Sequence, residues 1–328
     1  LQVQRPKNYQ LGQEKWFLDL VGIATLSDMV PLQGENRMLA HYGLLVMRRA
    51  RRPGLAALLK LLKIKPATIT EDDVGFMISP RINAASRMGN PHTAARLLAA
   101  SENDNPMALA QELQALNDER KGVVAATVKE ANKRLSEMTP SPLIVLGSTS
   151  WRPGILGLVA SSLVETHQKP VFLWGREGGE TLKGSCRSDG VVNIVECMQG
   201  AADVFADYGG HHGAGGFSLP EENAHELHAK LEHAYEALRG ESAQAVEVVI
   251  DREVELAELT HALRAVQKLA PFGVGHTKPL FVLPGVQVAN IKTFGKTQNH
   301  LGLTLTKVDA RAEAIAFFSC ADSFKKPI

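Results

Sequence analysis

A single amphipathic run between Asn105 and Leu135 constrains the fold of this chain more than any other stretch. Apolar side chains recur there at intervals of three and four, the spacing that places them on one face of an α-helix. Asn105 and Pro106 are a good N-cap residue and a good first-turn residue. The pattern predicts one helix of roughly 30 residues with the charged residues 118–121 on its outer face. Such a helix suits a connector between lobes better than a core helix.

The pattern changes after the Thr-Pro-Ser-Pro sequence at residues 139–142. We expect a buried strand at 143–146, a glycine-bearing loop, a helix at 155–166 and a second strand at 171–174. This order predicts an α/β unit, in which the helix N-terminus faces the carboxyl end of the strand and favours anions. A third strand over 182–188 would place Ser185 and Arg187 on one face and Cys186 on the other.

A glycine- and histidine-rich stretch, residues 208–217, follows the third strand. Five of the eight residues from Gly209 to Gly216 are glycine, and His211 and His212 are adjacent within it. Glycine lets the backbone approach a ligand closely. Two interpretations are open: a flexible turn with solvated histidines, or a phosphate or metal site. We expect this loop to lie between helices near 192–206 and 224–238.

The N-terminal third contains two cationic stretches and one isolated acid. A helical pattern at 14–26 ends at Asp28, which is either a cap or turn former or a catalytic carboxylate. Residues 36–65 contain arginines and lysines and no acid, so they form either a solvated helix face or a surface that follows phosphates. Residues 78–90 contain Arg81 and Asn83 and almost no acid, and these donors suit either phosphate binding or helix capping.

The C-terminal part, after residue 241, has a different sequence pattern. Short strand-like runs at 246–250, 285–288, 300–305 and 314–317 are separated by Gly, Pro and polar turns, with one helical stretch at 255–269. Short strands at this spacing predict a small β-barrel.

The composition limits the class of protein. The 328 residues are 45% hydrophobic and 22% charged, as in a globular protein of two or three domains. The net charge of +1 means that any basic surface is local. The three cysteines are odd in number and lack C-x-x-C spacing, which argues against a disulfide framework and a cysteine-rich zinc site and favours a reducing cytoplasm. No apolar run is long enough for a membrane span. The polar opening without Met suggests a piece of something longer.

Several short motifs together resemble the RecJ family of single-strand-specific 5′→3′ DNA exonucleases, within the DHH phosphoesterase superfamily. In chain order, the motifs are residues 27–32 (SDMVPL), 80–84 (PRINA), 151–157 (WRPGILG), 184–188 (GSCRS), 209–211 (GGH) and 269–273 (LAPFG). Each motif is weak alone, and their shared order makes the match specific. The resemblance implies an α/β protein with the remnant of a DHH lobe at 1–50, a helical connector at 51–138, a DHHA1 domain at 139–240 and an OB-like β-barrel at 241–328 that is incomplete at its C-terminus.

The resemblance also implies roles for individual residues. Asp28 is similar to a late carboxylate ligand of Mn²⁺ or Mg²⁺, a hard cation that prefers oxygen. His211 is similar to the histidine that faces the scissile phosphate. The phosphate-binding residues implied are Arg81, Asn83, Ser185, Arg187, Gly209 and Gly210. The implied partners are single-stranded DNA, held in the barrel by charge and stacking, and a single-strand-binding protein or helicase in DNA repair and recombination.

This sequence also differs from the family pattern, and the differences lead to the main expectation. Neither the Asp-His-His motif nor the earlier Asp-x-Asp motif occurs, and His211-His212 follows glycine. Arg152 and His276 replace the usual residues, so neither is expected to act directly. We therefore expect the C-terminal portion of a RecJ-like exonuclease that lacks a complete metal site. The alternatives are a non-catalytic single-strand-binding protein and a DHH-family phosphodiesterase acting on short oligonucleotides.

Overall fold

The computed structural model describes residues 12–176, 178, 181–239, 249–295 and 298–319. The chain divides into two compact units. One unit is Leu1–Val46 with Glu247–Ile328, here called the OB unit, and the other is Met47–Val246, here called the α/β unit. No helix in the described ranges is long and apolar enough to cross a membrane.

The α/β unit begins with packed helices and ends in an α/β domain. Its helices are α3 (Pro53–Leu61), α4 (Ser79–Arg87), α5 (Pro91–Ala99), α6 (Pro106–Glu137), α7 (Pro153–His167), α8 (Ile194–Gly200) and α9 (Leu227–Arg239). A π-helical turn, Asp73–Ile78, leads into α4. Its strands are β1 (Ile144–Ser148), β2 (Val171–Gly175), β3 (Leu182–Arg187), β4 (Asp207–His211) and β5 (Ala214–Leu219).

The long helix predicted from the apolar pattern is α6, which has 32 residues. The Asn105 side chain accepts a hydrogen bond from the Ala108 N–H at 3.4 Å, and Pro106 occupies the first turn, as the sequence predicts. Near its C-terminus, Arg134 donates to the Gly147 carbonyl at 3.0 Å and lies 5.1 Å from the Trp151 ring. These contacts fix the loop that leads into α7, and thereby the start of that helix.

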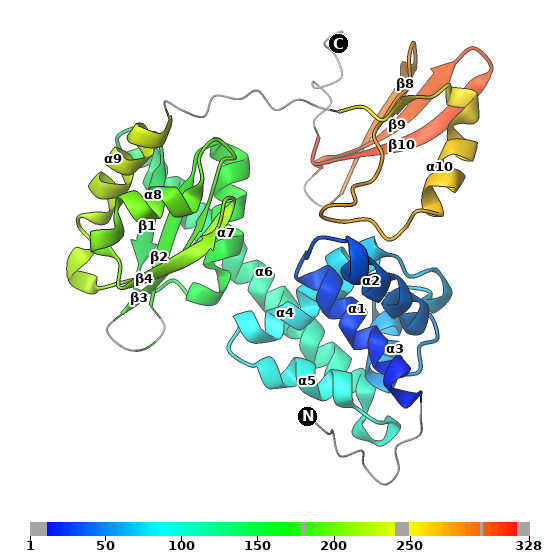
Figure 1. Ribbon diagram of the computed structural model, residues 1–328, viewed down its shortest axis with the longest axis horizontal. Helices are drawn as coiled ribbons and strands as arrows, with labels where there is room; N and C mark the ends of the chain where they lie inside the picture. Colours follow the sequence, from blue (N-terminus) through cyan, green and yellow to red (C-terminus); the bar gives the residue numbers. More distant parts are fainter. Residues whose placement is uncertain (1–11, 177, 179–180, 240–248, 296–297, 320–328) are drawn as a thin grey trace. The chain divides into compact units, whose positions relative to one another are not determined.

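The five strands form one mixed sheet in the order β1-β2-β3-β5-β4. The β1–β2 pair is parallel, and the other pairs are antiparallel. Helices α6 and α7 cover one face through an apolar cluster that includes Ile155 and Leu173, and α8 and α9 cover the other through a cluster that includes Phe172 and Leu231 (Figure 1). The predicted strands at 143–146, 171–174 and 182–188 and the helix at 155–166 are confirmed within a residue or two.

The predicted glycine–histidine loop is instead a β-hairpin, and this corrects the sequence interpretation. Strands β4 and β5 pair from Asp207 to Ser218 around a turn at residues 212–213. The glycines therefore lie in paired strands, where Gly209 faces Gly216 and Gly210 faces Gly215. Glycine has no side chain with which to alternate, so the strand period is invisible in the sequence here.

The OB unit combines the first helices with the C-terminal strands. Its elements are α1 (Leu18–Ser27), α2 (Gly34–Met47), α10 (Leu259–Gln267), β6 (Arg252–Glu253), β7 (Phe281–Val282), β8 (Gln287–Phe294), β9 (His300–Lys307) and β10 (Ala310–Phe317). Strands β8, β9 and β10 form an antiparallel sheet, and β6 pairs with β7 in parallel. Among the described residues this OB-like sheet is open and not a closed barrel, unlike the expectation. The predicted strand at 246–250 falls mostly outside the described residues, and Val249 and Ile250 are not in a strand.

Two arginines of the cationic run at 36–65 have structural contacts within the α/β unit. Arg48 donates twice to the Ile69 carbonyl, at 3.1 and 2.9 Å, and Arg52 donates to the Leu98 carbonyl at 2.9 Å. Both arginines therefore satisfy backbone carbonyls at the ends of neighbouring segments of the α/β unit.

Candidate phosphate site and nucleic-acid interface

Three side chains predicted to face a phosphate lie on one face of the five-stranded sheet. Ala214 on β5 is directly opposite Arg187 on one side and His211 on the other. Residues directly opposite in adjacent strands project from the same face, so Arg187 and His211 share it. Ser185 shares it too, two residues before Arg187. Two strand spacings separate the Arg187 and His211 backbones, which is about 10 Å.

Glycines form the floor beside these side chains. Gly216 of β5 lies directly opposite Ser185, and Gly209 of β4 lies directly opposite Gly216. A Cβ built on Gly209 would have no heavy atom within 4 Å, and one on Gly216 would meet only the Gly184 carbonyl oxygen at 3.6 Å. The backbone is therefore accessible at both positions, and a ligand can approach it.

Gly210 has a different task from Gly209. Its Cβ would project to the other face, 2.3 Å from the Ala214 carbonyl oxygen and 2.6 Å from the Gly215 Cα. The hairpin strands thus pack too closely for any side chain at Gly210. Glycine at this position therefore allows the hairpin to form, and the phosphate contact predicted for Gly210 stays a prediction.

The hairpin turn orients the exposed His211 ring. The Gly213 N–H donates to His211 Nδ1 at 3.3 Å, so the neutral ring carries its proton on Nε2. The turn is held in place because Ser188 N donates to the Gly213 carbonyl and Ile194 N donates to the His212 carbonyl, both at 3.0 Å. His211 therefore presents a donor N–H, whereas the contact described for His212 is made by its backbone carbonyl.

Helix α7 lies directly against Ser185 and Arg187. The Arg187 Nη1 donates to the Cys186 carbonyl at 2.7 Å and to Ser185 Oγ at 3.3 Å, which fixes the guanidinium beside the hydroxyl. A Cβ on Gly157, in the first turns of α7, would lie 2.8 Å from Arg187 Nη2 and 3.1 Å from Ser185 Oγ. The absence of a side chain at Gly157 therefore makes room for this pair.

Arg187 belongs to a group of four arginines, here called the arginine cluster: Arg81 and Arg87 on α4, Arg120 on α6, and Arg187. Burial lowers the pKa of each of them. The charge of Arg187 further lowers the pKa of Arg87, and Arg87 and Arg81 further lower that of Arg120. Asp118 acts in the opposite direction on Arg81 and Arg120. Cations held this close repel one another, and a bound anion would relieve the repulsion.

The arginines of the cluster are positioned by specific contacts. Arg81 is only 8% exposed, and it donates to Gln114 Oε1 at 2.8 Å and to the Met77 carbonyl at 2.7 Å. Arg87 donates to the Gly154 carbonyl at 3.0 Å, at the start of α7. The Nε of Arg120 is buried and has no hydrogen-bond partner among the described residues.

Arg81 and Asn83, the two residues of α4 predicted to bind phosphate, have different surroundings. Arg81 is a member of the cluster, but the hydrogen bonds described above commit it to protein groups. Asn83 lies one helical turn before Arg87 on the same face of α4.

Arg87 and Arg120 are cluster members that the sequence interpretation did not single out. The donor-rich segment 78–90 contains Arg87, whereas the sequence places Arg120 on the outer face of the connecting helix. One turn before Arg120, Asn117 is fully buried, and both polar atoms of its amide lack partners in the described part of the chain. The face of α6 that carries Asn117 is therefore polar and buried. Its burial results from the packing of α4 against α6, which the sequence pattern of α6 does not predict.

Asp28, the predicted metal ligand, lies in the OB unit. It is the exposed C-cap residue of α1, and its N–H donates to the Ala24 carbonyl at 2.9 Å. Its carboxylate oxygens suit Mn²⁺ or Mg²⁺. However, the described residues contain no group of three or more His, Cys, Asp or Glu side chains that could hold a metal ion. Asp28 can be one ligand, and it does not form a metal site with described neighbours.

A row of rings crosses the outward face of the sheet in the OB unit. Phe294, His300 and Phe317 are directly opposite one another on β8, β9 and β10, with ring centroids 5.4 Å apart in each pair. Phe318 packs against His300 at 4.9 Å. In the next row, a Cβ on Gly302 would meet only the Lys292 carbonyl oxygen at 3.6 Å. Phe317 and Phe318 are exposed and Phe294 and His300 half-buried, and such rings beside an open glycine and a lysine suit the stacking of bases.

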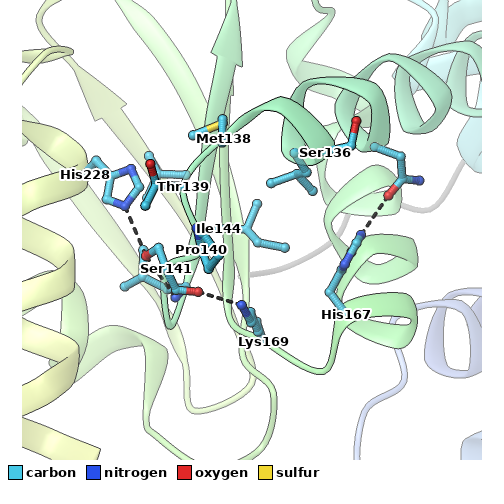
Figure 2. A pocket seen from close by; sticks show the side chains of 13 residues that line it. Ser136, Met138, Thr139, Pro140, Ser141, Ile144, His167, Lys169 and His228 are labelled. Atoms are coloured by element: carbon cyan, nitrogen blue, oxygen red, sulfur yellow. Dashed lines mark hydrogen bonds between the residues drawn. The ribbon is translucent and has the colours of Figure 1, made fainter.

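A cavity of about 290 Å³ contains Ser141 and His228 and superficially suggests a nucleophile–base pair (Figure 2). Ser141 Oγ donates to Glu232 Oε1 at 3.0 Å, so its single proton is committed there. His228 Nε2 lies 3.1 Å from the Ser141 hydroxyl oxygen, and with the Ser141 proton directed to Glu232, the ring N–H of His228 is the donor in that contact. Lys169 also donates to the Ser141 carbonyl at 2.6 Å. The group is a structural network at the start of β1.

The two residues that replace the usual family residues are also engaged structurally. Arg152 pairs with Glu119 at 3.4 Å, and both side chains are 52% exposed. The His276 ring stacks on Phe272 at 5.2 Å, and its Nε2 lies 3.0 Å from the Leu269 carbonyl oxygen. Neither observation assigns a direct role to these residues.

Comparisons with known proteins agree with this architecture. A model of the DHHA1 domain matches residues 141–237, and a model of the RecJ OB domain matches residues 250–327. The single-stranded-DNA-specific exonuclease RecJ of Bacillus subtilis is 31% identical over 92% of this chain, and that of Escherichia coli is 30% identical over 80%. The chain spans 38% and 48% of these two relatives.

Solved structures give the same result. The crystal structure of RecJ in complex with Mn²⁺ from Thermus thermophilus matches 95% of this chain with a TM-score of 0.78 and 30% identity, and the chain covers 45% of it. A second structure, of exonuclease RecJ bound to manganese, matches 67% of the chain with a TM-score of 0.53 and 34% identity, and the chain covers 55% of it.

Proposed function

We propose that this chain, which belongs to the RecJ family, is the phosphate- and strand-binding part of a single-stranded-DNA-specific 5′→3′ exonuclease. The observation that carries the proposal is the common sheet face of Ser185, Arg187 and His211 over a glycine floor. In phosphoryl transfer, the protein mainly positions the groups and stabilises charge, and these donors suit that task.

Each residue has a proposed task. Arg187 holds a nonbridging phosphate oxygen, with Ser185 Oγ as a second donor. His211 donates its Nε2 proton to an oxygen of the scissile phosphate. The other arginines of the cluster add positive charge behind Arg187, and the open backbone at Gly209 lets the phosphate approach the sheet. We expect Arg187→Ala mainly to weaken binding, and His211→Ala to lower turnover.

The proposed cofactor is Mn²⁺ or Mg²⁺, which would polarise phosphate oxygens and activate water when bound. Asp28 is the one residue of this chain proposed as a ligand. Because Asp28 has no described acidic or histidine neighbours that complete a site, the remaining ligands must come from elsewhere in the protein. The proposed substrate strand would lie on the ring row of the OB unit, with Phe294 and Phe317 stacking on bases.

An activity assay of the 328-residue chain tests the proposed division of tasks. We expect the chain to bind single-stranded DNA and to show no processive degradation of a 5′-phosphorylated strand in the presence of Mn²⁺. Robust degradation would contradict the incomplete metal site. Absence of any binding to single-stranded DNA would contradict the strand-binding role.

The proposed place of action is the cytoplasm, because Cys186 and Cys197 are buried free thiols. A single-strand-binding protein or a helicase is the proposed partner class, since either one generates or holds the strand that such an enzyme degrades. Co-purification of the chain with either protein tests this part of the proposal.

A further inference from the structure

The OB unit contains a groove, separate from the ring row, between α2 and residues 268–271. It is here called the α2 groove, has a volume of about 450 Å³, and is lined by Gly34, Arg37, Met38, His41, Tyr42, Lys268, Ala270 and Pro271. The volume lies in the range of roughly 300–1,000 Å³ that is typical of sites for small ligands. A single nucleotide of a longer strand is an occupant of this scale.

The charge of the groove favours an anion. Arg37 and Lys268 are cations, His41 adds ring nitrogens, and none of these described lining residues is Asp or Glu. The Arg37 Nη2 donates to the Leu269 carbonyl at 2.7 Å, and its Nε is buried without a hydrogen-bond partner among the described residues. The guanidinium is thus fixed in place while no carboxylate of the lining offsets its charge, a preorganised arrangement for a phosphate oxygen.

The apolar lining favours a base in addition to a phosphate. Met38 and Tyr42 lie one helical turn apart on α2 and are 52% and 51% exposed. The His41 ring meets the Tyr42 ring edge to face, with centroids 5.3 Å apart and planes at 87°. This contact supports the Tyr42 ring, and the ring's exposed surface is available for stacking.

We propose that the α2 groove is a nucleotide subsite for a nucleic-acid strand, in which Arg37 and Lys268 bind a phosphate and Tyr42 stacks on a base. The inference rests on the proposed function, because it names a further contact of the same single-stranded substrate. An acidic peptide would use the cations but would not need a flat ring, so the nucleic acid is the occupant that matches both features.

The test is the binding of a labelled oligothymidylate to the full 328-residue chain by fluorescence anisotropy, in EDTA so that no hydrolysis occurs. Tyr42→Ala should raise the dissociation constant roughly 5- to 150-fold, the effect of losing one stacked base. Tyr42→Phe keeps the ring and should bind like the unaltered chain. Lys268→Ala should weaken binding and reduce the slope of log affinity against log salt by about 0.7.

Two controls separate the subsite from general electrostatics. Lys15→Ala removes a charge elsewhere in the OB unit and should leave the affinity almost unchanged. Polyphosphate carries the charges without bases, so Tyr42→Ala should not alter its binding, whereas Lys268→Ala should weaken it. A photoreactive thymidine analogue in the strand should cross-link to the peptide that contains Tyr42.

The outcomes are distinguishable. If the chain binds the oligonucleotide but Tyr42→Ala and Lys268→Ala bind equally well, the α2 groove is not a subsite, and the proposed function survives. If Tyr42→Ala weakens polyphosphate and oligonucleotide alike, the stacking part is wrong. If the unaltered chain does not bind single-stranded DNA at all, both the subsite and the strand-binding role are wrong.

Discussion

Arg187 and His211 lie on the same face of one sheet with only Ala214 between them. In sequence they are separated by a loop, helix α8 and a short 3-10 helix, and strand register brings them together. Their two backbones are about 10 Å apart, and the proposed function has the Arg187 guanidinium and the His211 Nε2 donor act on one phosphate. This relationship underlies the predictions that follow.

The two neighbouring glycines of β4 should respond oppositely to alanine. Gly210→Ala should destabilise the chain by about 1–3 kcal/mol, because the new Cβ meets backbone atoms of β5. Gly209→Ala should change the free energy of unfolding by less than about 0.5 kcal/mol, because nothing lies within 4 Å of its Cβ. It should nevertheless weaken DNA binding, since the methyl group covers the ligand face. Urea denaturation and anisotropy measure the two effects, and equal stability of both variants would contradict the packing described for the hairpin.

Gly157→Ala should separate binding from stability in a different way. The new methyl group would displace the tip of the Arg187 side chain, which can move without disturbing the backbone. We expect a melting temperature close to that of the unaltered chain and a severalfold weaker affinity for single-stranded DNA. A matched change elsewhere on α7, Ser162→Ala, should affect neither property. Unchanged DNA affinity in Gly157→Ala would show that the position of Arg187 is unimportant.

Inorganic phosphate should stabilise the chain through the arginine cluster. A ligand that binds only the folded state at about ten times its dissociation constant adds about 1.4 kcal/mol of stability, or a few degrees in melting temperature. The shift should disappear in Arg187→Met and shrink in Arg87→Met. Arg152→Met, which removes a surface ion pair with Glu119 in the same unit, serves as the control and should keep the shift. A phosphate effect that persists in Arg187→Met would place the anion elsewhere.

Cys186 and Cys197 should be unreactive in the folded chain. Burial raises the pKa of each thiol from the ordinary 9.0 to about 12. Between these values the folded state holds protons that the unfolded state releases, so stability should fall as the pH rises above about 9 and be insensitive to these groups below it. Peptide-level mass spectrometry after iodoacetamide treatment at about pH 8, below the ordinary thiol pKa, should show both thiols unlabelled until denaturant is added. Rapid labelling without denaturant would contradict their burial.

The sequence predicts the elements with a clear side-chain period and misses those without one. Strands β1 and β2 are short, buried apolar runs, and α6 repeats its apolar residues along most of its length. Both patterns therefore predict their elements from the sequence. The hairpin of β4 and β5 is invisible because Gly209, Gly210, Gly215 and Gly216 have no side chains to alternate. The open sheet of the OB unit depends on pairings that a run of short strands does not specify.

The candidate site shows the same limit. Alternation along β3 predicts that Ser185 and Arg187 share a face, and the structure agrees. Their proximity to Arg87, by contrast, depends on how α4 packs near the start of α7. Helical periodicity places Arg120 on a polar face of α6, and it cannot reveal that another helix covers that face. Residues that act through packing between distant segments are the ones that sequence reasoning missed.

The most direct test of the central claim is the rate of strand cleavage by a protein that carries this chain behind the N-terminal part present in its longer relatives. His211→Ala should lower the single-turnover rate about 100-fold or more, the loss typical for one donor to a developing oxyanion, with DNA affinity largely retained. The adjacent His212→Ala is the matched control and should cleave at the unaltered rate. If His211→Ala cleaves as fast as His212→Ala, His211 does not face the scissile phosphate, and the account of the sheet face is wrong.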